Sequence, residues 1–106
     1  GLQNGRKMGF PTANIQYNHE KLLPCDGVYF GKVNGFDAVI NIGKNPTFDA
    51  EERTIEAHLI DFKGNLYDQR LTVFFYEKIR DDIKFNNMNE LVKQIESDIN
   101  YVKGRK

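Results

Sequence analysis

Two runs of β-branched and aromatic residues near the middle of the chain predict adjacent strands. They cover Val28–Val33 and Phe36–Ile42, and only Asn34 and Gly35 separate them. Asn-Gly between two such runs is a strong hairpin signal, because both turn residues tolerate a positive φ. The pattern therefore predicts an antiparallel β-hairpin.

Three further stretches have strand character. Thr54–Phe62 alternates apolar and polar residues, Leu71–Ile79 is rich in aromatic and branched side chains, and Thr12–Gln16 is a short candidate. In the 71–79 stretch, simple alternation puts Leu71, Val73, Phe75 and Ile79 on one face and Phe74 and Tyr76 on the other. Both faces of that strand are therefore expected to be covered.

The periodicity changes near the C-terminus. Apolar residues recur there at helical spacing and form one stripe; they are Met88, Leu91, Val92, Ile95, Ile99 and Val102. Asn87 with Glu90 three residues later resembles a capping box, which predicts a helix over about 87–103. We expect this helix to lie against the outside of the sheet, with Phe74 and Tyr76 as partners. Short antiparallel strands of this kind predict a small closed or partly open β-barrel.

Composition narrows the class of protein. The chain has 106 residues, which fits one domain, and its 15 Lys and Arg balance 15 Asp and Glu. A zero net charge argues against a nucleic-acid binder. The single cysteine, Cys25, rules out an intrachain disulfide and fits a reducing compartment, so we expect a cytoplasmic protein. No apolar run is long enough to predict a membrane span. A glycine at position 1 suggests a piece of a longer chain.

Thr12 and Asn14 are the first candidates for chemistry. On an extended segment residues i and i+2 project the same way, so the two side-chain oxygens can converge. Neutral oxygens with free coordination positions suit Mg²⁺, which takes its other ligands from water and phosphates. Upstream, the glycine-spaced segment Gly1–Gly9 carries Arg6 and Lys7, which suit a phosphate chain. The alternatives are a side-chain-bonded turn at Pro11–Asn14 and a mobile end before it.

Glu56 and His58 are a second pair of candidates. They share the face of the 54–62 strand opposite Ile55, Ala57 and Leu59. If that face borders a pocket, Glu56 is a candidate general base, because transfer of a phosphoryl group to an alcohol requires an acceptor for the hydroxyl proton. If the face is solvated, Glu56 is an ordinary surface residue, and His58 can equally be a structural histidine.

The charged connector between the last strand and the helix, residues 79–85, has two interpretations. Such a segment is usually a solvated surface. Arg80 and Asp82 can instead bond the polar edge of a ligand that lies on Phe85 or on the helix.

Six motifs in order resemble the riboflavin kinase (flavokinase) family, and most closely the C-terminal kinase module of bacterial bifunctional riboflavin kinase/FAD synthetases. They are Gly-Arg-x-x-Gly-Phe-Pro-Thr-Ala-Asn from residue 5, Gly-Val-Tyr from 27, Asn-Ile-Gly-x-x-Pro-Thr-Phe from 41, Ile-Glu-x-His-Leu from 55, Leu-Tyr from 66 and Ile-Arg-x-x-x-Lys-Phe from 79. The resemblance covers the chain from Gly1 to about Asp98.

The resemblance implies a fold and a reaction. The fold is a six-stranded antiparallel Greek-key barrel with a C-terminal helix, and residues 1–106 are one kinase domain that lacks the first strand of the family. The reaction is Mg²⁺- and ATP-dependent phosphorylation of the riboflavin 5′-hydroxyl, which gives FMN and ADP. An N-terminal adenylyltransferase domain is expected in the full-length chain. The alternative is a non-catalytic flavin- or nucleotide-binding module of the same fold.

The resemblance also assigns residues to roles. Thr12 and Asn14 match the metal ligands, and Glu56 matches the catalytic base. The nucleotide-binding positions are Gly1, Gly5, Arg6, Thr12 and Tyr67, and the flavin-binding positions are Arg80 and Asp82. Two positions depart from the family pattern, since Asp68 replaces a glycine and Asp82 replaces a glutamate. Neither change affects the proposed metal ligands or the base.

Overall fold

The predicted hairpin is formed by β2 (Gly27–Val33) and β3 (Phe36–Lys44). The computed structural model describes residues 12–15, 22–44, 53–64 and 70–105. Strand pairing runs from Val33 opposite Phe36 to Gly27 opposite Ile42. Asn34 and Gly35 have φ values of 49° and 87°, and this left-handed pair is the geometry that the Asn-Gly sequence predicts.

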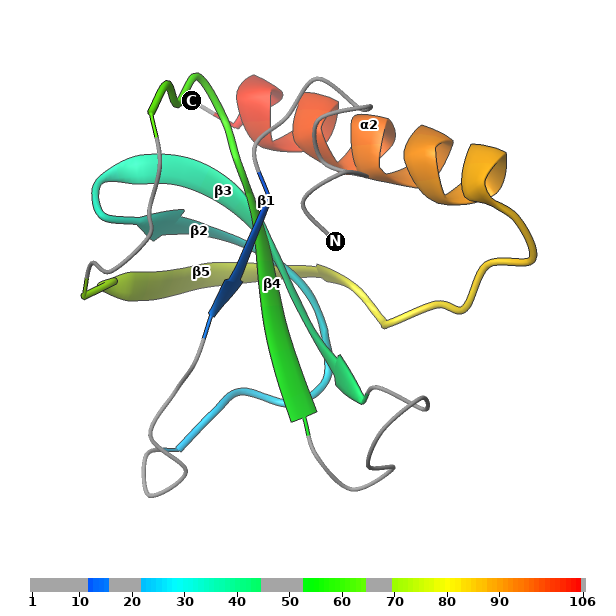
Figure 1. Ribbon diagram of the computed structural model, residues 1–106, viewed down its shortest axis with the longest axis horizontal. Coiled ribbons are helices and arrows are strands. Elements are labelled where there is room, and N and C mark those ends of the chain that lie inside the picture. Colours follow the sequence, from blue (N-terminus) through cyan, green and yellow to red (C-terminus); the bar gives the residue numbers. More distant parts are fainter. Residues whose placement is uncertain (1–11, 16–21, 45–52, 65–69, 106) are drawn as a thin grey trace.

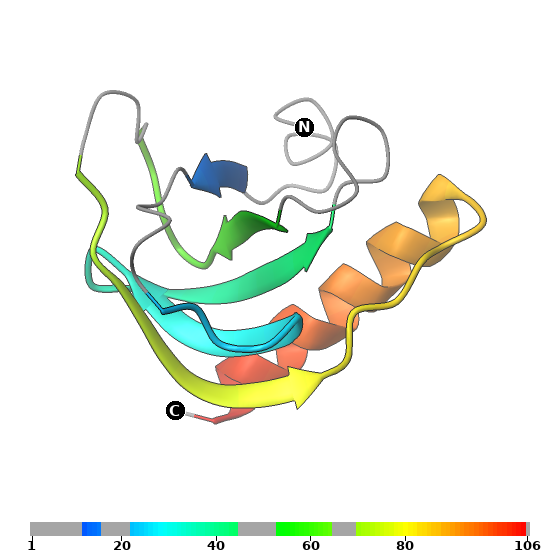
Figure 2. The ribbon, with the colours of Figure 1, turned by 90° about the horizontal axis from the view of Figure 1, so that it is seen from below.

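The other strands extend the sheet on both sides of the hairpin. They are β1 (Thr12–Ile15), β4 (Arg53–Leu59) and β5 (Val73–Arg80), and the antiparallel order is β1-β4-β3-β2-β5. Figure 1 shows β4 between β1 and β3, and Figure 2 shows that the sheet is strongly curved. Within the described ranges β1 and β5 are the two edges. The prediction of a small antiparallel β-barrel with a C-terminal helix is confirmed.

The concave side of the sheet holds the larger apolar core. Its buried members come from β2, β3 and β4; they are Tyr29, Val33, Ala38, Ile40, Ile42, Ile55, Ala57 and Leu59. On β4 these are the alternate residues that the sequence pattern assigned to the apolar face. The same alternation leaves Glu56 and His58 on the opposite face.

Helix α2 (Met88–Gly104) covers part of that opposite face. Asn87 caps it by accepting a hydrogen bond from the Glu90 backbone N–H at 2.9 Å, as the capping-box pattern predicts. A second apolar cluster joins the helix to the sheet; its buried members are Val28, Val39, Ile60, Ile95, Ile99 and Val102. The helix is therefore positioned by β2, β3 and the end of β4.

The prediction that Phe74 and Tyr76 pack under the helix is wrong. Their exposed fractions are 54% and 55%, and they stack on each other with ring centroids 6.5 Å apart. The helix packs over β3, so Phe74 and Tyr76 on the edge strand β5 remain uncovered. The expectation that both faces of β5 are covered is therefore wrong for this part of the strand.

The prediction that Ile79 shares a face with Val73 and Phe75 is also wrong. The pairing of β2 with β5 shifts between Phe30 and Gly31, so that two β5 residues are passed for one of β2. Such an irregularity reverses the alternation of faces beyond it. As a result Ile79 packs in the helix cluster, whereas Val73 and Phe75 pack in the inner core.

None of the helices in the described part of the chain combines the length and the apolar character needed to cross a membrane.

Candidate active site

A row of three polar residues crosses the sheet on the face opposite the inner core. Glu56 on β4 is directly opposite Asn14 on β1 and directly opposite Asn41 on β3. Residues opposite each other in antiparallel strands project from the same face. The fold therefore places Asn14, a predicted metal ligand, beside Glu56, the predicted base, on one face of the sheet.

A second row lies next to the first. His58 is directly opposite Thr12 on one side and Val39 on the other. The register puts Thr12 on the same face as Asn14 and Glu56, although the structure describes only the backbone of Thr12. Its predicted role as a metal and nucleotide ligand stays a prediction.

The electrostatics of the two rows differ. The side chain of Glu56 is 36% exposed, and partial burial raises the pKa of its carboxyl group above the ordinary value. His58 is buried, and its Nε2 lies 3.6 Å from Oε1 of Glu56. Burial lowers the pKa of His58 to about 4, although the negative charge of Asp98 opposes this shift. At neutral pH the imidazole of His58 is therefore uncharged and places no positive charge beside Glu56.

The opposite wall of the site is organised by Arg80 and Asp98. Asp98 projects from α2 and is 3% exposed. It accepts hydrogen bonds from Arg80 Nε at 3.1 and 3.3 Å and from Nη2 at 2.8 Å. Gln94 donates a further bond to Asp98 at 3.0 Å, and Arg80 Nη1 donates to the Asp81 carbonyl at 3.0 Å. Arg80 thus ties the end of β5 to the helix.

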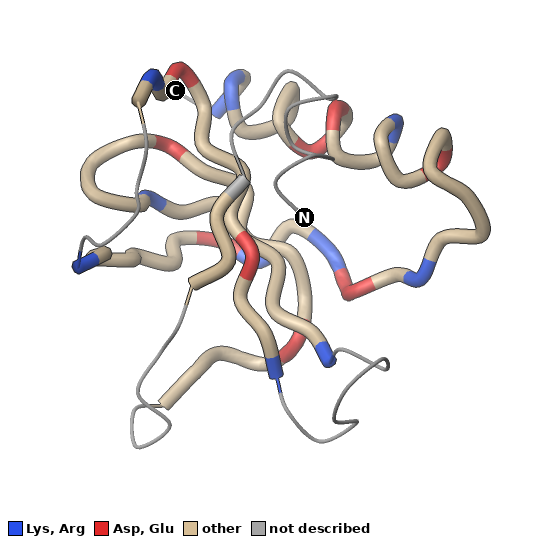
Figure 3. The backbone as a smooth tube through the Cα atoms, in the orientation of Figure 1, with Lys and Arg blue, Asp and Glu red and all other residues tan. Residues whose placement is uncertain are grey.

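The connector after Arg80 is held over the end of β3. Asp82 lies against Gly43, so that a Cβ at residue 43 would force the Asp82 carboxylate to move. Lys84 donates to the carbonyl of Lys44 at 3.2 Å and lies 3.9 Å from the Asp82 carboxylate. Figure 3 shows this alternation of charge along the connector. These contacts keep the connector close to the polar row on the sheet.

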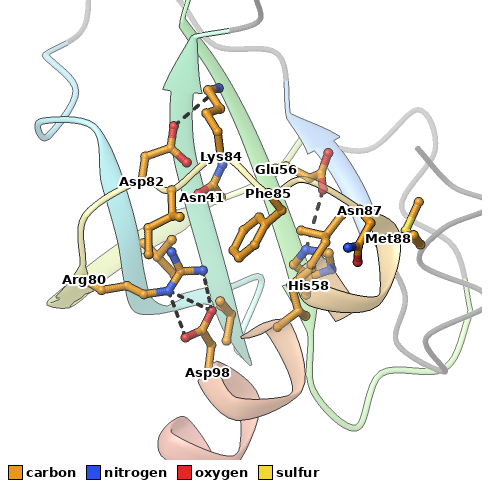
Figure 4. A pocket seen from close by; sticks show the side chains of 15 residues that line it. Asn41, Glu56, His58, Arg80, Asp82, Lys84, Phe85, Asn87, Met88 and Asp98 are labelled. Atoms are coloured by element: carbon orange, nitrogen blue, oxygen red, sulfur yellow. Dashed lines mark hydrogen bonds and ion pairs between the residues drawn. The ribbon is translucent and has the colours of Figure 1, made fainter. Parts of the chain in front are cut away.

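The sheet, the connector and the first turns of α2 line an open cavity of about 390 Å³. Its lining includes the predicted residues Glu56, Arg80 and Asp82, which Figure 4 shows around one space. The cavity also has lining residues to which sequence reasoning gave no site role: Asn41, Lys84, Asn87, Met88, Leu91 and Asp98. The sequence feature that could have identified Asn41 as a site residue is its position in the Asn-Ile-Gly motif. For Asp98 that feature is a charged residue at the edge of the apolar helical stripe.

Four predicted nucleotide-binding residues, Gly1, Gly5, Arg6 and Tyr67, lie outside the described residues, so the structure does not test them. Asn14 does fit a metal. Its side chain is exposed, and its amide oxygen is of the neutral type that Mg²⁺ accepts together with water and phosphate oxygens. Glu56 next to it adds negative charge on the same face.

The lowered pKa of His58 predicts a loss of stability in mild acid. The unfolded chain binds a proton near the ordinary pKa of 6.5, whereas the folded chain does so only at about 4. The stabilisation is therefore complete above pH 6.5 and is lost as the pH falls toward 4, by at most about 3 kcal/mol. Urea unfolding at pH 7.5 and at pH 5 measures this loss.

The matched control is His58→Gln, in which the free energy of unfolding should fall much less between pH 7.5 and pH 5. Comparing the two proteins removes the contribution of the other titrating groups. One of these is Glu56, whose raised pKa makes the folded protein more stable as the pH falls. Parallel losses in both proteins would show that His58 does not titrate in this way.

A family model and curated proteins with similar sequences agree on the family that this chain resembles. The family model described as "Flavokinase: Riboflavin kinase" matches residues 1–105. The "Bifunctional riboflavin kinase/FMN adenylyltransferase" of Haemophilus influenzae is 44% identical over 97% of this chain and 35% of its own length. The Bacillus subtilis protein of the same name is 42% identical over 92% of this chain and 33% of its length.

A solved structure named as a macrolide-efflux protein from Streptococcus pneumoniae has the same fold. It superposes with a TM-score of 0.83 at 34% identity, over 97% of this chain and 35% of that one. The chain thus spans about a third of the length of each of these relatives.

Proposed function

The chain belongs to the riboflavin kinase family, and on this premise we propose that it transfers the γ-phosphoryl group of ATP to the 5′-hydroxyl of riboflavin, giving FMN and ADP. The main support for this proposal is the position of Glu56. A partly buried carboxylate with a raised pKa stands at the sheet end of a cavity, flanked by Asn14 and Asn41. A protein that only binds flavin has no need of a base at this point.

Glu56 is the proposed general base. It accepts the proton of the 5′-hydroxyl, and the alcohol oxygen forms a bond to the γ-phosphorus of ATP. The bond from that phosphorus to the bridging oxygen breaks, and ADP leaves with the electron pair. The raised pKa supports this role, because a base is most effective when its pKa approaches the operating pH.

The nucleotide is proposed to lie on the β1 side of Glu56. Mg²⁺ bound with ATP supplies charge neutralisation there, and Thr12 and Asn14 are the residues proposed to hold it. Gly1, Gly5, Arg6 and Tyr67 are proposed to contact the nucleotide, which rests on their motif positions alone. The pairing of Asn14 with Glu56 supports a metal next to the base.

The flavin is proposed to lie on the connector side of the cavity, with Arg80 and Asp82 as its binding residues. The guanidinium of Arg80 lies 6.0 Å from the ring centroid of Phe85, and two of its nitrogens are already engaged by Asp98. We therefore expect Arg80 to act mainly by holding the connector and Phe85 in place for the flavin ring.

An FMN adenylyltransferase domain is the proposed neighbour of this module. The relatives from Haemophilus influenzae and Bacillus subtilis are named for both activities. In such an arrangement the adenylyltransferase domain would use the FMN that the kinase module releases.

Release of ADP tests the proposed function. With Mg-ATP present, adding riboflavin should start ADP formation, and FMN should appear in equal amount. Flavin fluorescence, read in the same samples, reports binding independently of turnover. Quenched riboflavin fluorescence without ADP formation would instead identify a non-catalytic binding module.

A further inference from the structure

Asn41 lies next to the proposed base on the side away from the proposed metal. Its strand, β3, lies between β4, which carries Glu56, and β2. Strand β2 pairs in turn with β5, the strand that leads to the connector. The register sets Asn41 directly opposite Glu56 and, on its other side, directly opposite Val28. Figure 4 shows Asn41 between Asp82 and Glu56 in the cavity.

This order gives a direction to a bound substrate. Asn14 marks the metal end, Glu56 the reacting hydroxyl, and the connector with Asp82 and Phe85 the opposite end of the cavity. A flavin with its ring at the connector and its terminal hydroxyl at Glu56 must pass its side chain over Asn41. Neighbouring strands are about 4.8 Å apart, so Asn41 faces carbons a few positions back from that hydroxyl.

The chemistry of Asn41 suits that part of the substrate. An amide offers both a donor and an acceptor, as does each hydroxyl of a polyol chain. In the described part of the chain no hydrogen bond engages the Asn41 side chain, and its neighbours on the cavity floor, Val28 and Val39, are apolar. The Asn41 amide is thus a polar group on the cavity floor, next to Glu56, and it is available to bind a ligand.

We propose that Asn41 binds the secondary hydroxyls of the ribityl chain and makes the site selective for a polyol over an alkyl alcohol. The inference rests on the proposed riboflavin kinase activity and adds a specificity-determining residue to it. A site built to bond a hydroxyl discriminates against the analogue that lacks it, because its own polar group is then left without a partner.

The test compares two substrates in two proteins. The substrates are riboflavin and a flavin with a 5-hydroxypentyl side chain, which keeps the ring and the terminal hydroxyl but lacks the three secondary hydroxyls. In Asn41→Ala, kcat/KM for riboflavin should fall at least tenfold, equivalent to about 1.4 kcal/mol. For the hydroxypentyl flavin the same variant should change kcat/KM less than about twofold.

Two further variants sharpen the test. Met88→Ala also alters the cavity lining, but through an apolar contact, and should lower kcat/KM by the same factor for both substrates. Asn41→Ser keeps a small hydrogen-bonding group and should recover part of the preference for riboflavin. An equal loss on both substrates in Asn41→Ala would overturn the role of Asn41 while leaving the kinase function intact. An unaltered protein that phosphorylates neither substrate would overturn the proposed function itself.

Discussion

Replacing Glu56 by Gln is expected to lower kcat for riboflavin phosphorylation by about 10²- to 10⁴-fold, the range for removal of a general acid or base. The affinity for Mg-ATP should stay within about twofold, because Gln keeps the shape of the side chain and the proposed nucleotide contacts lie toward β1. Initial rates of FMN formation and calorimetric titration with Mg-ATP measure the two quantities.

The control for this variant is the same chemical change on another strand. Glu77 on β5 accepts hydrogen bonds from Tyr101 at 3.1 Å and does not line the cavity, so Glu77→Gln should retain full turnover. If Glu56→Gln keeps kcat within about tenfold, equivalent to about 1.4 kcal/mol in the barrier, Glu56 is not the base.

Replacing Asp98 by Ala is expected to lower the free energy of unfolding by about 3 kcal/mol, because removing one partner of a buried ion pair leaves the other charge uncompensated. Asp98 is 3% exposed and is bonded by both Arg80 and Gln94, so its loss affects the end of β5 and the helix together. Urea unfolding followed by circular dichroism gives the change.

A double-mutant cycle assigns this loss to the pair. Arg80→Ala and the double variant complete the cycle, and the double variant should be less destabilised than the sum of the two single changes. Asp81→Ala is the control at an exposed site. It removes a surface ion pair with Lys78 at 2.7 Å and should leave the urea concentration at the unfolding midpoint unchanged within error. Strict additivity of the two single changes would show that Arg80 and Asp98 are not coupled.

The secondary structure was largely predictable because local chemistry decides it. Asn34 and Gly35 set a tight turn, and Asn87 with Glu90 caps the helix; each depends only on residues close in sequence. The alternation on β4 assigned Glu56 to the correct face. The same alternation failed on β5, since the irregular pairing near Gly31 depends on the neighbouring strand.

The site was predictable only in part. The register of β1 with β4 puts Asn14 and Glu56, the predicted metal ligand and the predicted base, on one face of the sheet. Asn41 and Asp98 were given no role, because nothing local shows that β3 lies between the base and the connector or that Asp98 faces Arg80. Strand order and helix placement arise from packing between segments far apart in sequence. The positions of Asn41 and Asp98 at the site depend on this packing.

Residue-by-residue titration with Mg-ADP and FMN, followed by amide NMR, shows where the nucleotide and the flavin bind. We expect amide signals of Asn14, Asn41 and Glu56, and of connector residues 81–85, to shift together as the ligands bind. Signals from the exposed aromatic face at Phe74 and Tyr76 should not move. Shifts confined to that aromatic face, with the row through Glu56 unchanged, would show that Glu56 is not at the binding site.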